Sequence, residues 1–307
     1  MTRKVQSLFL CLSALLSACS VHDRESAHEP ENVEPAPNIN ASSLVSYRGF
    51  AGPERVLYDA ERDRYLVSNV NGDPTSEDGN GFISVLSPDG EITALHWIES
   101  GQGGAQLDAP KGLAIAGGTL YVADITRVRT FDADTGAPTG EVSIPDSTYL
   151  NGLSATPDGK VYLTDSGPPR GTLDARGTEA IYLLQGGTAK LVSDGSLGRP
   201  TSVEWTKNGV LVAPFGASEV YRVDAQGKQQ QRTQLPLGGL AGVVSVGSWL
   251  FVSSWQASGI YRGRLGRDFE LVLDEQSSPT DIGYDSQRAR LLVPHFTTDS
   301  VDVFQLE

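Results

Sequence analysis

The chain of 307 residues carries 38 acidic and 24 basic side chains, a net charge of −14 at pH 7, and 39% of its residues are apolar. Such an acidic body argues against nucleic-acid binding, which needs basic patches, and disfavours binding to anionic membrane surfaces. Both cysteines, Cys11 and Cys19, lie close to the N-terminus. The remainder therefore has no disulfide, thiolate zinc site or cysteine nucleophile.

The first element in chain order is a targeting segment over residues 1–18, with a basic start, a short apolar run and a small-residue end. Its last residues and Cys19 read Leu-Ser-Ala-Cys, which resembles the lipobox of bacterial lipoproteins. The resemblance implies a lipidated Cys19 and, because Ser20 follows, an outer-membrane location facing the periplasm. A plain secretory leader is the alternative. We expect contact with the membrane through the lipid anchor only.

Residues 19–43 contain no aromatic residue and few aliphatic ones. Such a segment cannot bury enough apolar surface to repay the entropy of ordering, so we expect a flexible tether. The next run, Leu44 to Phe50, has the alternation of a strand.

Six related units follow, with starts 39 to 57 residues apart, and they are the main organising feature of the chain. The unit is clearest from Asn151 to Gly167, where an apolar strand, a Pro-Asp-Gly turn and a second apolar strand form a hairpin. No sustained helical periodicity occurs after the leader, so residues 44–307 are predicted to be all-β. The aligned units begin at Pro53, Pro110, Leu150, Pro200, Leu240 and Pro279.

Units of this length, each too small to bury a core alone, predict a six-bladed β-propeller. The last unit supplies only three strands before the chain stops. We therefore expect the Leu44 to Phe50 strand to complete the final blade. Two units carry insertions, at 69–81 and 167–177, and the first is expected to fold over the mouth of the central channel. The second residue of each innermost strand should line that mouth, namely Glu54, Lys111, Asn151, Thr201, Ala241 and Thr280.

The PERVLYD start, the Asn-Gly-Leu followed by a Pro-Asp-Gly turn, and strands such as LYVAD resemble the senescence marker protein, gluconolactonase and luciferin-regenerating enzyme family of six-bladed propellers. The resemblance spans 44–307 and its motifs indicate architecture more than chemistry. In catalytic members, a divalent cation is held by a first-blade Glu, the Asn of Asn-Gly-Leu and a later Asp. The resemblance therefore implies calcium, magnesium, manganese or zinc at Glu54, Asn151 and Asp281.

The third ligand is the weak point of this assignment. The blade starts at Thr201 and Ala241 have no carboxylate, and Asp281 lies one residue out of register, which turns a side chain to the other face of its strand. A metal would polarise a lactone or small ester, with Asp281 or Asp165 as the base. Asp165 has equivalents at other strand ends, so a structural turn role is the alternative.

Other residues of the mouth suggest other sites. Glu54, Lys111 and Asp281 could form an ion-pair cluster in a wet channel, or Lys111 and Arg55 could bind an anion such as a sugar acid. Trp255 and His295 end strands at the channel mouth and are further ligand-binding candidates. His295 could equally be a hydrogen-bonded structural residue.

Two functions of different class follow from these residues. One is a metal-dependent hydrolase of a lactone or small ester. The other is a non-catalytic scaffold that binds a small molecule in the channel or a protein of the cell envelope. A monomer is expected in both cases.

Overall fold

A computed structural model of the chain describes residues 34–167 and 179–307. Within these ranges the chain forms only strands, and it has no helix long and apolar enough to cross a membrane. The leader predicted over 1–18, the lipidation site Cys19 and most of the insertion at 167–177 lie outside the described residues.

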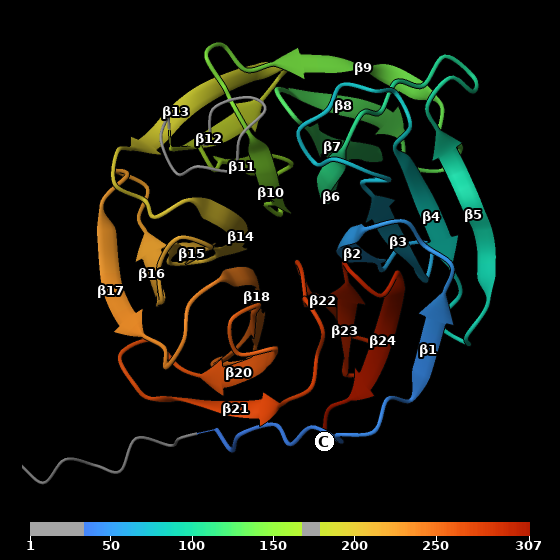
Figure 1. Cartoon of the computed structure of the whole chain (residues 1–307). Coiled ribbons are helices and arrows are strands. Elements are labelled where there is room, and N and C mark those ends of the chain that lie inside the picture. Colours follow the sequence, from blue (N-terminus) through green and yellow to red (C-terminus); the bar gives the residue numbers. More distant parts are fainter. Residues whose placement is uncertain (1–33, 168–178) are drawn as a thin grey trace, which may run out of the picture. The chain divides into compact units, whose positions relative to one another are not determined.

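The strands form six four-stranded antiparallel sheets, which confirms the predicted six-bladed propeller (Figure 1). In Figure 1 the first strand of each blade lies nearest the centre and the last lies at the rim. The first three blades comprise β2 (Pro53–Asp59), β3 (Arg64–Asn69), β4 (Phe82–Leu86) and β5 (Ile92–Glu99); β6 (Pro110–Ala116), β7 (Thr119–Asp124), β8 (Arg127–Asp132) and β9 (Pro138–Ser143); and β10 (Leu150–Ala155), β11 (Val161–Asp165), β12 (Ala180–Gln185) and β13 (Thr188–Asp194).

The remaining blades follow the same plan. They comprise β14 (Pro200–Thr206), β15 (Gly209–Pro214), β16 (Glu219–Val223) and β17 (Gln229–Gln234); β18 (Leu240–Val246), β19 (Trp249–Ser254), β20 (Gly259–Gly263) and β21 (Phe269–Leu273); and β22 (Gly283–Asp285), β23 (Arg290–His295), β24 (Ser300–Gln305) and β1 (Val45–Arg48).

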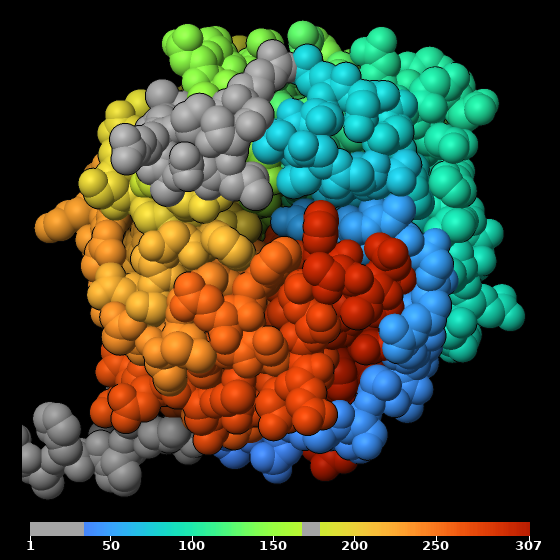
Figure 2. All heavy atoms as spheres, in the orientation of Figure 1, coloured from blue at the N-terminus to red at the C-terminus, as the bar shows by residue number. Residues whose placement is uncertain are grey.

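The final blade joins the two ends of the propeller, as predicted. Strand β1 pairs antiparallel with β24, from Val45 opposite Val303 to Arg48 opposite Ser300. Figure 2 shows this N-terminal segment (blue) along the edge of the last blade (red). The compact unit begins at Ala36, earlier than the predicted start at Leu44, because Asn38 and Asn40 donate backbone hydrogen bonds to the last strand's end.

Apolar side chains gather between neighbouring blades rather than inside one. One such cluster joins Leu66 and Ile83 of the first blade to Leu113 and Leu120 of the second, all fully buried. Equivalent clusters occupy the other seams around the ring, including the seam between the last blade and the first. A single unit therefore buries its apolar face only against its neighbours, as the repeat length implied.

One local feature recurs at the start of the innermost strand in most blades, and it positions the channel residues. Five of the six blades have a register shift there, so that the second residue has no partner of its own on the adjacent strand. In three blades this residue is followed by Gly112, Gly152 or Gly242. A Cβ at Gly152 would lie 2.5 Å from the carbonyl oxygen of Thr201 on the next blade. Glycine therefore allows the innermost strands to approach closely around the channel.

Candidate functional site

A cavity of about 290 Å³ opens at the end of the channel where the innermost strands begin. We call it the upper cavity. The predicted ring of strand-start residues meets here, with the exception of Lys111. Its lining consists of Glu54, Asn151, Thr201, Ala241 and Thr280 from that ring, together with Pro74, Tyr149, Ser166, Arg199, Phe215, Trp255 and Phe296.

Aromatic rings form much of the wall of the upper cavity. Phe215, Trp255 and Phe296 each follow directly after the second strand of their blades, β15, β19 and β23. The rings of Phe215 and Trp255 meet edge to face with centroids 5.7 Å apart, and Trp255 lies 6.0 Å from Phe296. Such contacts hold the three rings as one wall. The cavity is therefore suited to a flat, weakly polar molecule.

Two hydrogen-bond donors in this wall lack a partner among the described residues. They are Nε1 of Trp255 and Nε of Arg199. Arg199 also has a left-handed backbone, with φ of 58°, at a position that is Gly239 in the next blade. A bulky residue in this conformation costs free energy, and such residues cluster at functional sites. An acceptor atom on a bound molecule would satisfy both donors.

Among the residues that the structure describes, Glu54 is the one carboxyl group in the lining of the upper cavity. Burial raises the pKa of Glu54 above its usual range, the charge of Lys111 opposes this rise and that of Asp281 adds to it. Lys111 is fully buried. Its Nζ donates a hydrogen bond to the carbonyl oxygen of Ala109 at 2.9 Å and lies 4.4 Å from the ring centroid of Tyr149. Burial lowers the pKa of Lys111. The floor of the cavity is thus poor in fixed charge.

Asp281 faces a different set of groups. Its Oδ1 lies 2.8 Å from Nη1 of Arg55 and accepts a hydrogen bond from the Ser202 hydroxyl at 2.8 Å. Burial raises the pKa of Asp281, and the Arg55 charge opposes the rise. The Asp281 backbone N–H donates to the carbonyl oxygen of Glu54 at 2.9 Å, but Asp281 is absent from the described lining of the upper cavity, where Glu54 and Asn151 lie. The close ion pair of Asp281 is with Arg55, while the charges of Lys111 and Asp281 act on Glu54 without a direct ion pair among the three described side chains.

The donors of the upper cavity do not fit a hard divalent cation. Calcium or magnesium requires several oxygen ligands, usually with more than one ionised carboxylate. Here one carboxyl, Glu54, is accompanied by the Asn151 amide and by hydroxyl groups, and burial disfavours the ionised form of Glu54. No group of three or more metal-binding side chains occurs among residues 34–167 and 179–307.

Asp165 and His295 are engaged in the scaffold. Asp165 is fully buried, and its carboxylate accepts hydrogen bonds from the backbone N–H groups of Thr148, Tyr149 and Gly167. His295 contacts the carbonyl oxygen of Ser277 through Nδ1 and lies 3.2 Å from the Asp302 carboxylate through Nε2. Neither lines the upper cavity.

The insertion at 69–81 does reach the upper cavity, through Pro74. Asp73 accepts hydrogen bonds from the backbone and hydroxyl of Thr75, which is a local turn. Asn71 likewise bonds within the loop, to the carbonyl of Asn80 at 2.8 Å. The insertion therefore borders the cavity, and its polar residues stabilise its own turns.

Sequence reasoning identified Trp255 and missed Phe215, Phe296, Tyr149 and Arg199. The signal was present in the repeat, because the position after the second strand can be aligned across blades as readily as the strand start. Backbone hydrogen bonds mark the equivalence, for Phe215 N donates to Arg199 O and Trp255 N donates to Gly239 O. The aligned residues are Val70, Ile125, Ser166, Phe215, Trp255 and Phe296.

Comparison with known proteins supports the fold at low sequence identity. No family model and no curated protein matches the chain. A gluconolactonase from Xanthomonas campestris is 16% identical, with 89% of this chain and 95% of that one covered and a TM-score of 0.63. Virginiamycin B lyase from Staphylococcus aureus is 14% identical, with 85% and 98% covered and a TM-score of 0.61.

A third neighbour comes from a nidogen/laminin complex. It is 16% identical, with 72% of this chain and 86% of that one covered and a TM-score of 0.56. The fold is thus similar to that of gluconolactonases, of a lyase and of a protein from a protein–protein complex. At this identity the likeness concerns the fold, because a propeller can host unrelated functions.

Proposed function

We propose that this protein binds a small, flat and largely apolar molecule carrying a carbonyl or carboxylate oxygen, in the upper cavity. The observation that carries the proposal is Nε1 of Trp255, a buried donor without a partner among the described residues, set in a wall of three aromatic rings. A ligand of this class would stack on the rings and accept the hydrogen bonds that Trp255 and Arg199 leave unmade.

Hydrolysis of a lactone or small ester is the second candidate, and its support is the likeness to a gluconolactonase. Within the cavity, Glu54 is the group suited to act on a carbonyl, because burial favours its protonated, hydrogen-bond-donating form. A divalent cation would polarise the same carbonyl. Because the donors around Glu54 and Asn151 do not fit such a cation, we assign no step to a metal.

Both candidates are tested by calorimetric titration with dihydrocoumarin, an aromatic lactone, in the presence of a chelator. We expect saturable binding without a metal. Trp255→Phe keeps an aromatic ring but removes the donor, and it should weaken binding several-fold, by about 1 kcal/mol. Trp249→Phe, which alters a tryptophan outside the upper cavity, is the matched control. Absence of binding to dihydrocoumarin and other aromatic esters would overturn the proposal and favour the protein-binding alternative.

The same samples separate binding from hydrolysis. Chromatography of the incubated lactone should recover it intact if the protein only binds, and should find the hydroxy acid if the protein hydrolyses it. Thermal melting with added calcium, magnesium, manganese or zinc then addresses the metal. We expect no shift. A shift that is lost in Glu54→Gln would restore a metal to the upper cavity.

We also propose that the protein acts from the outer membrane, facing the periplasm, through a lipid on Cys19. The Leu-Ser-Ala-Cys sequence supports this location. Expression of the full-length chain in bacteria fed radiolabelled palmitate should label the wild-type protein but not the Cys19→Ser variant. Equal labelling of both, or none of either, would contradict the anchor.

A further inference from the structure

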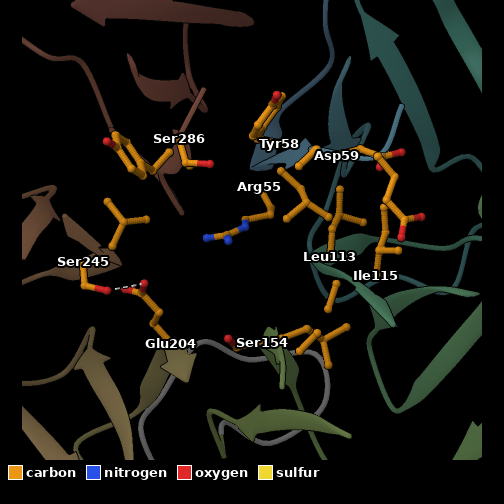
Figure 3. Close-up of a pocket in the computed structure, with 18 of the residues that line it drawn as sticks. Arg55, Tyr58, Asp59, Leu113, Ile115, Ser154, Glu204, Ser245 and Ser286 are labelled. Atoms are coloured by element: carbon orange, nitrogen blue, oxygen red, sulfur yellow. Dashed lines mark hydrogen bonds between the residues drawn. The ribbon is translucent and has the colours of Figure 1, made fainter. Parts of the chain in front are cut away.

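A second cavity, of about 470 Å³, lies at the opposite end of the channel, where the innermost strands end (Figure 3). We call it the lower cavity. Arg55, the neighbour of Glu54, lines this cavity and is absent from the lining of the upper one. Figure 3 shows its guanidinium pointing into the space, with Glu204 and Ser245 reaching in from other blades.

Two buried polar atoms of this cavity have no hydrogen-bond partner among the described residues. One is Nε of Arg55, whose Nη1 is engaged with Asp281 and with the carbonyl oxygen of Ile282, each at 2.8 Å. The other is Oε2 of Glu204, whose Oε1 accepts a hydrogen bond from Ser245 at 2.7 Å. Other contacts therefore hold the Arg55 guanidinium and the Glu204 carboxyl group in place, while one nitrogen of Arg55 and one oxygen of Glu204 have no hydrogen-bond partner.

The other charged groups of the lower cavity already have ionic partners. Asp59 is ion-paired with Arg62 at 3.3 Å and with Arg64 at 2.9 Å. Glu61 is exposed at the rim and lies 3.3 Å from Arg62. Unsatisfied buried groups are costly and uncommon in folded proteins. Arg55 and Glu204 thus form a pair of complementary contact points for a molecule that enters from solvent.

Apolar side chains form about half of the wall between these two points. Leu57, Leu113, Ile115 and Val244 line the cavity together with the ring of Tyr284. A molecule that fits must therefore present an acceptor to Arg55, a donor to Glu204 and an apolar body to the walls.

We propose that the lower cavity is a binding site for a small zwitterion, an amino acid with an apolar side chain, whose carboxylate contacts Arg55 and whose ammonium contacts Glu204. A carboxylate on an arginine and an ammonium on a carboxylate both form charge-assisted hydrogen bonds. Burial also raises the pKa of Glu204 to about 7, with the Ser245 hydrogen bond and the Arg55 charge opposing it. An ammonium bound beside Glu204 would favour the carboxylate form.

This site is independent of the one proposed above. Arg55, Asp281 and Ser202 form a buried polar layer, and Glu54 lies on one side of it while Glu204 lies on the other. Occupation of one cavity therefore requires no change in the other. The two proposals can fail separately.

The test is calorimetric titration at neutral pH with L-leucine, N-acetyl-L-leucine and L-leucinamide. The second compound lacks the ammonium and the third lacks the carboxylate. We expect L-leucine to bind most tightly and each derivative to bind at least about tenfold more weakly, since every tenfold corresponds to about 1.4 kcal/mol. Glu204→Gln should weaken L-leucine by a similar factor and abolish the preference over N-acetyl-L-leucine.

Two further variants serve as controls. Ser245→Ala removes only the hydrogen bond that orients Glu204 and should weaken L-leucine to a smaller extent. Trp255→Ala, in the upper cavity, should leave L-leucine binding unchanged while it impairs dihydrocoumarin binding. The proposal is overturned if L-leucine does not bind at millimolar concentration, if N-acetyl-L-leucine binds equally well, or if a folded Glu204→Gln variant binds L-leucine as the wild type does.

Discussion

Nη1 of Arg55 lies 2.8 Å from Oδ1 of Asp281, and this ion pair separates two cavities at opposite ends of the propeller channel. The two residues come from the first and the last blade, whose strands also meet in a parallel bridge between the same positions. At this position of the innermost strand, three other blades have a glycine, namely Gly112, Gly152 or Gly242. The first and last blades have Arg55 and Asp281 there instead. The pair therefore contributes to ring closure as well as to the division of the channel.

The first prediction concerns this pair. Asp281→Asn leaves the Arg55 guanidinium buried without its counter-charge, and we expect the free energy of unfolding to fall by about 3 kcal/mol. Urea denaturation measures the change. Ser202→Ala, which removes one hydrogen bond to the same carboxylate, should cost about 1 kcal/mol. Equal effects of the two substitutions would contradict the assignment of the charge pair.

The second prediction concerns the left-handed backbone of Arg199. Arg199→Gly should raise the free energy of unfolding by about 1 kcal/mol, because glycine adopts this φ without strain. It should also weaken dihydrocoumarin binding, because a donor of the upper cavity is lost. Gly239→Ala at the equivalent position of the next blade is the control and should destabilise the protein. A destabilised Arg199→Gly variant would show that strain is not concentrated here.

The third prediction concerns pH. The pKa of Glu204 in the folded protein is about 7, above its unfolded value of 4.5, so the folded state holds this proton more tightly. The resulting stability is present below about pH 4.5 and is lost as the pH rises through about 7. Glutamine does not ionise, so the Glu204→Gln variant should not lose this stability as the pH rises. The groups facing Glu204 are Ser245, Arg55 and Asp281, and they are the same in both proteins.

We therefore expect Glu204→Gln to be more stable than the wild type at about pH 8, by on the order of 2 kcal/mol, and equally stable at about pH 4. Denaturation at both pH values measures the difference. Glu91→Gln, on the exposed turn between β4 and β5, should show no such change with pH. A constant difference at both pH values for Glu204→Gln would indicate a packing effect instead.

The fourth prediction concerns closure of the ring. Truncation that removes β1 exposes the pairing edge of β24, from Ser300 to Val303. It also removes Tyr47 from the apolar cluster between the last blade and the first. We expect the melting temperature to fall by several degrees or more, as a cost of a few kcal/mol implies. A chain that begins at Glu34 is the control and should melt as the full chain does. Unchanged melting without β1 would refute its role in closure.

Much of the fold follows from local patterns in the sequence. The Pro-Asp-Gly turns and the recurring apolar pairs of strands were sufficient to predict six blades, and the missing fourth strand after Val301 to Leu306 predicted closure by the segment at Leu44 to Phe50. These features are repeated, so each copy supports the interpretation of the others.

The site was less predictable, because its residues are determined by side-chain direction. The metal assignment depended on Asp281 turning toward Glu54, although the two are one register position apart. In the structure, that single step directs Asp281 toward Arg55 and Ser202. A residue's neighbour across the channel belongs to another blade, so no local pattern specifies it.

The lower cavity could not be predicted for a related reason. Glu204 and Ser245 lie in the second halves of β14 and β18, at positions with no distinctive sequence motif, and their contact spans two blades. A buried, unpaired carboxylate oxygen is visible only when every neighbour has been placed. The aromatic wall of the upper cavity could have been predicted from the sequence, because Phe215, Trp255 and Phe296 occupy the same position of the repeat.

The central claim is that the aromatic upper cavity is a ligand site. Tryptophan fluorescence during titration with dihydrocoumarin in a chelator tests it most directly, because Trp255 is the only tryptophan in the described lining of that cavity. We predict saturable quenching in the wild type and in Trp249→Phe, and its loss in Trp255→Phe. Saturable quenching that persists unchanged in a folded Trp255→Phe variant would contradict the account.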